Sequence, residues 1–250
     1  MNMSFDFRRR TLVLTGANGG IGREVAKLFG AAGANLVLSD LDVSALEAFV
    51  GNELDVPAER VAMLGVDSTK PEDADALVAL AAGRFGGIDF LVPSAGIYLA
   101  QPFAEMTDQQ WHQTIAVNLD GVFYVCRRAV AHLREQSSIV NISSLAAHRG
   151  AFYNAHYSAT KGALISLTRS LARELAPNTR VNAVSPGIID TPMASELIRR
   201  RGADSVAQTP LARVGKPEEI ASVIGFLCSD AAAFVTGEVI NVNGGLHMAG

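Results

Sequence analysis

Cysteine is nearly absent from this sequence: Cys126 and Cys228 are the two cysteines in 250 residues. Two thiols cannot form the disulfide framework of a small secreted protein, and their separation matches no common pattern of metal ligands. Both lie in apolar surroundings, so we expect two buried thiols and no metal site. A reducing compartment, the cytoplasm, fits this use of cysteine.

Charge of either sign is scarce as well, and so are long apolar runs. Charged residues make up 18% of the chain, and 21 basic against 25 acidic residues give a net charge of −4. Nucleic-acid-binding proteins are usually strongly basic, so we expect no nucleic-acid partner, and the arginines at residues 8–10 are expected to be solvated. No apolar run approaches the roughly 18 residues that cross a membrane, so no membrane partner is expected. The start of the chain does not resemble a signal peptide.

What the sequence does contain is a regular alternation of strand and helix patterns. Hydrophobic residues make up 49% of the chain, enough for a full core, and residues 1–250 are expected to form one domain. Strands are expected at residues 11–15, 35–39, 60–66, 88–92, 138–142, 180–184 and 238–242, and helices at residues 21–32, 43–49, 71–85, 108–134, 157–175 and 218–227. The alternation predicts an α/β fold: a doubly wound, seven-stranded parallel sheet with helices on both faces.

A glycine-rich turn joins the first expected strand to the first helix. Gly16, Gly20 and Gly22 lie within the segment Thr15-Gly-Ala-Asn-Gly-Gly-Ile-Gly22. Glycine lets the backbone turn sharply and approach a ligand closely, and the free N–H groups of a helix start attract a pyrophosphate. The spacing G-x-x-x-G-x-G differs from the more common G-x-G-x-x-G. A turn of this composition at this place predicts a dinucleotide site.

This segment resembles the T-G-x-x-x-G-x-G pattern of the short-chain dehydrogenase/reductase family. The resemblance implies a Rossmann-type fold and a nicotinamide-dependent oxidoreductase. It also implies that Ile21 contacts the cofactor through its backbone, and that Asn18 and Gly19 lie beside the phosphates.

Asp40 follows the second expected strand, where an acidic side chain can accept hydrogen bonds from both ribose hydroxyls of NAD. The same carboxylate would repel the 2′-phosphate of NADP. NADP-preferring relatives carry a basic residue at places occupied here by Leu41 and Gly19, whereas Arg23 is expected to lie on the helix with a minor role. We therefore expect NAD rather than NADP, with Asp40 and Leu41 beside the ribose. The alternative is a solvated aspartate at a strand end.

Two further strand ends fit the resemblance. In relatives, an aspartate placed like Asp67 contacts the adenine, and the fourth strand ends in N-N-A-G. This chain has Pro93, Ser94, Ala95 and Gly96 there. Because Pro93 removes a backbone donor, the local geometry is expected to differ from that of relatives. Ser94, Ala95 and Gly96 are still expected to approach the nicotinamide ribose.

Tyr157 and Lys161 form a Y-x-x-x-K pattern at the start of a helix. Residues four apart share a helix face, so both side chains can project into one site. A free tyrosine has a pKa near 10 and is a poor base at neutral pH. A nearby ammonium and a positive nicotinamide ring are expected to lower that pKa, so that Tyr157 can take a proton from an alcohol or return it.

Two polar residues complete the catalytic set that the resemblance implies. Ser144 follows the fifth strand and precedes Tyr157 by the spacing of the family, although the neighbouring Ser143 is an alternative. A hydroxyl there can hydrogen-bond the substrate oxygen and stabilise developing charge. In relatives, an asparagine placed like Asn118 holds a water molecule that links the lysine to solvent.

A P-G motif follows the sixth strand, and in relatives it forms a wall against the nicotinamide. The matching residues here are Pro186, Gly187, Ile189 and Thr191. The stretch 193–214 after it has the least regular pattern in the chain, and it is either a flap over the site or a surface connection. His148, Tyr153 and His156 either face the substrate or have surface and packing roles.

The expected function is therefore hydride transfer between NAD and a secondary alcohol or ketone, with Tyr157 as general acid and base. Segments 210–219 and 241–245 resemble the 3-oxoacyl-carrier-protein reductases, so an NADPH-dependent reductase of that kind is the alternative. A protein that senses the nucleotide without turnover is a third interpretation, but both Tyr157 and Lys161 are present. The resemblance also implies a homotetramer, assembled through the long helices and the C-terminal segment.

Overall fold

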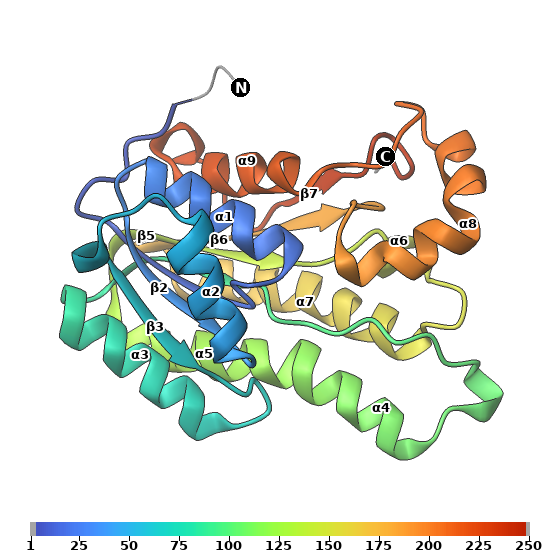
Figure 1. The fold of residues 1–250 in the computed structure, drawn as a ribbon, viewed down its shortest axis with the longest axis horizontal. Helices are drawn as coiled ribbons and strands as arrows, with labels where there is room; N and C mark the ends of the chain where they lie inside the picture. Colours follow the sequence, from blue (N-terminus) through green and yellow to red (C-terminus); the bar gives the residue numbers. More distant parts are fainter. Residues whose placement is uncertain (1–3, 249–250) are drawn as a thin grey trace.

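The computed structural model describes residues 4–248, which form one parallel sheet covered by helices (Figure 1). The strand order is β3-β2-β1-β4-β5-β6-β7 in a seven-stranded sheet. The strands are β1 (Thr11–Thr15), β2 (Asn35–Asp40), β3 (Val61–Gly65), β4 (Ile88–Pro93), β5 (Leu133–Ile142), β6 (Thr179–Pro186) and β7 (Val239–Val242). The predicted doubly wound parallel sheet is confirmed. Since all strands run the same way, their carboxyl ends meet along one edge.

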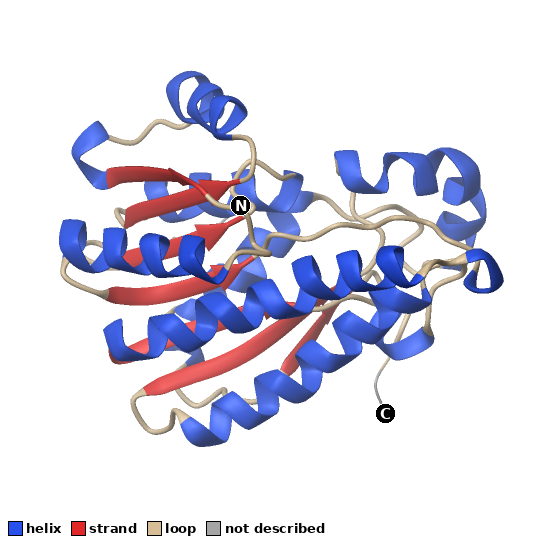
Figure 2. Cartoon of the chain, turned by 90° about the horizontal axis from the view of Figure 1, so that it is seen from below, coloured by secondary structure: helices blue, strands red, loops and turns tan. Residues whose placement is uncertain are grey.

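Helices lie on both sides of the row of strands (Figure 2). They are α1 (Gly20–Ala31), α2 (Val43–Glu53), α3 (Pro71–Phe85), α4 (Asp108–Ile115), α5 (Gly121–Ala129), α6 (Ala146–Arg149), α7 (Ala155–Glu174), α8 (Ser195–Gln208) and α9 (Pro217–Cys228). Among residues 4–248, no helix combines the length and the apolar run that a membrane crossing requires.

The strands divide their side chains between two cores, one on each face of the sheet. Leu12 and Leu14 of β1 pack with α1 and α9, whereas Val13 between them packs with α3 and α5. Leu36, Val37 and Leu38 of β2 divide in the same way. Because successive strand residues point to opposite faces, a strand covered twice must be apolar at every position. This double burial explains the continuous apolar runs in the sequence.

The helix expected at residues 108–134 is wrong in two respects. The chain forms α4, then one π-helical turn, η3 (Ala116–Asp120), then α5 and a short 3₁₀ turn, η4 (Val130–His132). Leu133 and Arg134 belong to β5, because Leu133 pairs with Ile88 and the Arg134 guanidinium bonds Asp89. A helical pattern in sequence does not reveal an inserted π turn or a distant ion-pair partner.

The stretch 193–214 contains α8, a regular helix that its sequence pattern did not predict. Thr191 caps the short 3₁₀ turn η5 (Pro192–Ala194) before it, through a hydrogen bond from the Ala194 N–H to the Thr191 hydroxyl. The helix therefore begins directly after the loop that follows β6.

A buried carboxylate ties the amino ends of three strands together, at the edge opposite the site. Asp89 of β4 is 1% exposed and accepts hydrogen bonds from the Thr11 backbone N–H at 2.8 Å and from Arg134 Nη1 at 2.6 Å. Arg10 Nη1 donates to the other carboxylate oxygen at 3.0 Å. A charge this well buried is tolerated because two cations and a backbone donor surround it.

Asp89→Ala should lower the free energy of unfolding by about 3 kcal/mol, because it leaves two guanidinium groups without their shared partner. Urea denaturation followed by circular dichroism measures this loss. Asp6→Ala is the matched control, because Asp6 pairs with Arg8 at the surface, where the Asp6 side chain is 60% exposed. The control should keep the wild-type midpoint. Equal midpoints for both variants would show that Asp89 does not hold the strands together.

Candidate active site

The glycine-rich turn is packed directly against the end of β4. Gly16 has a left-handed φ of 64°, and a Cβ atom there would lie 2.7 Å from the Ala95 backbone nitrogen. The Ala95 N–H donates to the Thr15 hydroxyl at 3.2 Å, which fixes the same contact from the other side. A Cβ at Gly22 would lie 2.1 Å from the Gly16 carbonyl oxygen. Only glycine therefore fits at Gly16 and Gly22, and the turn has a single shape.

The start of α1 forms a cradle for an anion. Gly19 is the N-cap, and no side chain of the described residues caps it, so the first N–H groups of α1 keep their donor capacity. A Cβ at Gly20 would meet the Thr191 methyl group at 2.7 Å. The loop after β6 thus closes over the glycine turn, with Ile21 between Gly20 and Gly22 at the helix start. These bare helix amides and the absent Cβ atoms fit a pyrophosphate.

Asp40 lies at the end of β2, next to the glycine turn. Its Oδ2 atom accepts a hydrogen bond from the Asn18 backbone N–H at 2.9 Å. Leu41 follows it with 75% of its surface exposed. A carboxylate oxygen has two lone pairs, so the Asp40 carboxylate keeps acceptor capacity for ribose hydroxyls. The structure thus joins Asp40 to Asn18 of the glycine turn, a contact that the sequence did not reveal.

Asp67 lies just beyond β3, and its side chain hydrogen-bonds Thr69 in the same loop. Its Oδ1 atom accepts hydrogen bonds from the Thr69 hydroxyl at 2.7 Å and from the Thr69 backbone N–H at 3.0 Å. These hydrogen bonds, the largest cause, lower the pKa of Asp67. Asp67 is therefore a carboxylate at neutral pH and lies on the same sheet edge as Asp40.

Pro93 occupies the last position of β4, and Ser94 follows it, partly buried. Pro93 still pairs with Thr15 of β1, so the proline lies within the sheet. A Cβ at Gly96 would lie 3.2 Å from Asn118 Oδ1 and 3.9 Å from Lys161 Nζ. Ala95 and Gly96 therefore connect the glycine turn to the residues expected to be catalytic.

Asn118 lies within the π-helical turn η3 and is fully buried. Its side chain binds the backbone of Ile97 twice: Oδ1 accepts the N–H at 2.8 Å and Nδ2 donates to the carbonyl at 2.9 Å. A π turn inside a helix shifts the backbone register and is frequent at functional sites. The amide therefore fixes the strand-end loop at Ile97 rather than pointing into open solvent.

Tyr157 and Lys161 project from the first turns of α7 toward the end of β5. Lys161 is 6% exposed, and its Nζ atom donates to the Ile142 carbonyl at 2.8 Å. The same atom lies 5.6 Å from the centre of the Tyr157 ring. Burial lowers the pKa of Lys161 to about 8. The site therefore holds an ammonium group in surroundings that disfavour its charge.

The expected lowering of the Tyr157 pKa does not occur in the protein by itself. Burial, the largest cause, raises this pKa to about 12, although the Ser144 hydroxyl opposes the shift through a hydrogen bond and the neighbouring Tyr98 adds to it. The prediction counted the attraction of the ammonium and of a bound, positive nicotinamide ring, and it did not count desolvation of the phenolate. Tyr157 is therefore a neutral phenol at pH 7.

The two adjacent serines have different surroundings. Ser143 is 2% exposed, and its hydroxyl donates to the Lys161 carbonyl at 2.9 Å, which joins β5 to α7. Ser144 is partly exposed, accepts the Ala146 N–H at 3.1 Å and has a lowering effect on the pKa of Tyr157. The geometry therefore favours Ser144 over Ser143 as the residue that faces a substrate oxygen.

The loop after β6 runs beside these groups. The Pro186 carbonyl accepts the Leu145 N–H at 2.8 Å, so the loop lies next to Ser144. A Cβ at Gly187 would lie 2.8 Å from Asn243, and Ile189 is buried. A cavity of about 480 Å³ opens behind the loop, between α8 and the C-terminal segment, and its lining does not include Tyr157.

Tyr98 is a site residue that the sequence reasoning missed. Its ring meets the Tyr157 ring edge to face, with centroids 4.8 Å apart. Such a contact fixes the orientation of the phenol. The only sequence signal was an aromatic residue two positions after Gly96. The direction in which the Tyr98 side chain points depends on the loop at Ile97, which Asn118 holds.

The three residues left open between the serine and the tyrosine have different environments. His148 stacks on His247, with centroids 4.6 Å apart. Tyr153 is 48% exposed with a left-handed φ of 60°, and its carbonyl accepts the Gln101 N–H at 2.7 Å. His156 is fully buried, and its ring nitrogens have no hydrogen-bond partner among the described residues. No hydrogen bond or ring contact in the described part of the chain joins these three to Tyr157. Residues 4–248 contain no cluster of three or more metal-ligating side chains.

Comparisons with known proteins cover nearly the whole chain. A family model described as enoyl-(acyl carrier protein) reductase matches residues 16–247. A 3-oxoacyl-[acyl-carrier-protein] reductase of Thermotoga maritima is 37% identical, over 95% of this chain and 97% of the relative. A cis-4-hydroxycyclohexanecarboxylate dehydrogenase of Sinomonas cyclohexanicum is also 37% identical, over 96% of this chain and 97% of the relative. A solved structure from Brucella melitensis, described as short-chain dehydrogenase/reductase SDR:Glucose/ribitol dehydrogenase, is 65% identical with a TM-score of 0.97, and the match covers 99% of this chain and 100% of that chain.

The buried ammonium predicts how stability depends on pH. The unfolded chain binds the Lys161 proton with the ordinary pKa of 10.5, and the folded chain binds it with a pKa of about 8. Protonation therefore penalises folding fully below pH 8, and the penalty disappears as the pH rises from 8 to 10.5. Lys161→Met removes it, so the stability of this variant relative to wild type should fall by about 2 kcal/mol between pH 7 and pH 10. Urea denaturation of both proteins at the two pH values measures this, and an unchanged difference would show that Lys161 is not desolvated.

Proposed function

Because the chain belongs to the short-chain dehydrogenase/reductase family, we propose that it is an NAD-dependent enzyme that transfers hydride between nicotinamide and a secondary alcohol or ketone. The observation that carries the proposal is the position of Tyr157 at the carboxyl edge of the sheet, where the Ser144 hydroxyl lowers its pKa and the Lys161 Nζ atom lies 5.6 Å from its ring centre. Ligands of open α/β sheets bind at this edge.

Tyr157 moves the proton. Its raised pKa keeps it a phenol at neutral pH, so it can donate to the oxygen of a ketone as negative charge develops there. In the reverse direction it accepts the proton of an alcohol after losing its own. Ser144 offers a second hydrogen bond to the same oxygen and stabilises the developing charge.

Lys161 holds positive charge beside the phenol. An ammonium group has three N–H donors, and the Ile142 carbonyl takes one of them. The other two would be available to the Tyr157 oxygen and to the ribose hydroxyls of a bound nucleotide. Asn118 keeps Ile97 and Gly96 against the lysine, so its role is to hold the wall of this site.

The residues along the strand ends fit a dinucleotide. The amides of Gly20, Ile21 and Gly22 would hold the pyrophosphate, with Gly19 beside it, while Asp40 would accept from the adenosine ribose and Asp67 would lie toward the adenine. Ser94, Ala95 and Gly96 would border the nicotinamide ribose, and Pro186, Gly187, Ile189 and Thr191 would border the nicotinamide. When bound, the nicotinamide supplies the hydride acceptor or donor. Asp40 supports NAD because its carboxylate would repel a 2′-phosphate.

The second candidate is an NADPH-dependent 3-oxoacyl-carrier-protein reductase. Several relatives are named 3-oxoacyl-[acyl-carrier-protein] reductases, including those of Thermotoga maritima and Aquifex aeolicus, and this favours the second candidate. Asp40 and the exposed Leu41 oppose it, because no cation stands next to Asp40 on its own strand end. A nucleotide sensor without turnover is a weaker candidate, because both Tyr157 and Lys161 lie in the site.

The proposed assembly is a homotetramer in the cytoplasm. Phe123 of α5 and Val130 of η4 support an interface on this side, because they are 47% and 42% exposed in one chain. The two buried free thiols support a reducing compartment. Light scattering in solution should give four times the chain mass of 26.3 kDa, and a monomer mass would contradict the assembly.

Tyr157→Phe should lower kcat/KM by a factor of about 10² to 10⁴, because the acid and base is gone while the ring stays in place. Turnover of a panel of cyclic and open-chain secondary alcohols, followed through NADH formation, measures the loss. The dissociation constant of NADH, from fluorescence titration, should stay within about twofold of the wild-type value.

Tyr124→Phe is the control for this experiment, because it removes a tyrosine hydroxyl on α5, outside the site. Its turnover should equal that of the wild type. Near-normal turnover in Tyr157→Phe would exclude Tyr157 as the proton donor.

A further inference from the structure

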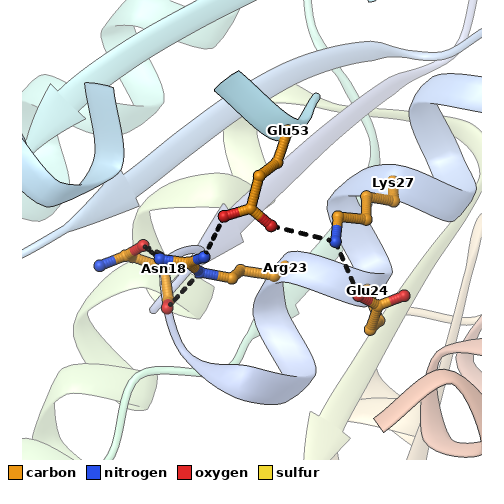
Figure 3. Close-up of polar contacts among 5 residues, drawn as sticks. All are labelled: Asn18, Arg23, Glu24, Lys27 and Glu53. Carbon is orange, nitrogen blue, oxygen red and sulfur yellow. Dashed lines mark hydrogen bonds and ion pairs between the residues drawn. The ribbon is translucent and has the colours of Figure 1, made fainter. Parts of the chain in front are cut away.

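Five polar side chains link the start of α1 to the end of α2 (Figure 3). They are Asn18, Arg23, Glu24, Lys27 and Glu53, and they lie beside the glycine turn rather than at the catalytic tyrosine. Sequence reasoning gave Arg23 a minor role because it sits on the helix. The structure confirms that Arg23 is on α1 but shows its guanidinium reaching back to the turn.

Arg23 holds Asn18 by three hydrogen bonds. Its Nη2 atom donates to Asn18 Oδ1 at 2.6 Å, and its Nε atom lies 3.1 Å from both Oδ1 and the Asn18 carbonyl oxygen. The guanidinium also lies over the Phe49 ring, 4.9 Å from its centroid. The planar fork of an arginine suits such a fixed arrangement.

Glu53 completes the arrangement from α2. Its Oε1 atom accepts from Arg23 Nη1 at 2.6 Å, and its Oε2 atom accepts from Lys27 Nζ at 3.3 Å. Glu53 is the last residue of α2, where the helix dipole disfavours a negative charge. A carboxylate at this helix end therefore gains little from its own helix, and its favourable contacts are the two cations of α1.

The arrangement is joined through Asn18 to Asp40, the proposed ribose ligand. The Asn18 backbone N–H donates to Asp40 Oδ2, while the Asn18 side chain and carbonyl bind Arg23. The Arg23 side chain is 32% exposed, so a ligand in the adenosine region can reach it if its present partners release it. A guanidinium near the ribose is the group that accommodates the 2′-phosphate of NADP.

We infer that Glu53 sets the nucleotide preference by holding Arg23 on Asn18, away from the ribose 2′ position. The Glu53 carboxylate offsets the charge of Arg23, so the Asp40 carboxylate is the charged group that acts on the ribose, and NAD is preferred. Glu53 is thus a positioning residue that acts through Arg23, and Arg23 is a latent phosphate ligand. This inference rests on the proposed binding of a nicotinamide dinucleotide, and it concerns the preference between two such nucleotides.

The test is Glu53→Gln, which keeps the shape of the side chain and removes its charge. Fluorescence titration with NADH and with NADPH gives two dissociation constants for each protein, and their ratio is the readout. The ratio should shift toward NADPH by about fivefold in Glu53→Gln, the factor that one exposed ion pair can supply. The NADH constant itself should change by less than about twofold.

Glu24→Gln is the matched control. Glu24 contacts Lys27 at 3.0 Å, and no hydrogen bond or ion pair joins its side chain to that of Arg23 in the described residues, yet the change in net charge is the same. Its ratio should equal that of the wild type. The double variant Arg23→Gln/Glu53→Gln should lose the shift, because the released cation is then absent.

Three outcomes would overturn the inference: no shift in Glu53→Gln, an equal shift in Glu24→Gln, or a shift that persists in the double variant. The wild-type ratio tests the proposed function separately. If the wild type already prefers NADPH, the NAD assignment fails, while the change between wild type and Glu53→Gln still tests Arg23. Binding of neither nucleotide by the wild type would overturn both.

Discussion

The candidate site depends on one buried cation. Lys161 carries its ammonium into a region with almost no water, and the Ile142 carbonyl is the one hydrogen-bond acceptor that the described residues give it. Its charge is costly there, as its lowered pKa shows. The sheet and α7 must therefore be rigid enough to keep the group in place. Two apolar cores, one on each face of the sheet, provide that rigidity.

The same burial that depresses the lysine raises the pKa of the tyrosine. Without a ligand, Tyr157 is a neutral phenol and Lys161 is close to losing its proton. Burial thus disfavours the charged form of both side chains, the phenolate of Tyr157 and the ammonium of Lys161. A bound oxidised nicotinamide brings a positive charge and a ribose that can use the free donors of Lys161. Without a ligand, Tyr157 therefore favours donating its proton. The positive charge of a bound oxidised nicotinamide would lower the pKa of Tyr157 and so favour proton acceptance.

Local patterns predicted most of the fold, and they also pointed to the residues of the candidate site. The apolar strand runs and the glycine spacing depend on near neighbours in sequence, and so does the four-residue step from Tyr157 to Lys161. Features that depend on distant contacts were missed. The π turn at Asn118 follows from its bonds to Ile97, and the early start of β5 follows from Asp89. The direction of the Tyr157 pKa depends on how much water the surrounding elements displace, which spacing alone does not reveal.

The central claim is that the strand-end carboxylate at Asp40 and the bare amides of the glycine turn bind NAD and disfavour NADP. Titration of the purified wild-type protein with NADH and with NADPH tests this most directly, because it needs no knowledge of the alcohol or ketone. The account predicts a lower dissociation constant for NADH. A lower constant for NADPH would contradict the role of Asp40 and support the carrier-protein reductase, and binding of neither would contradict the dinucleotide site itself.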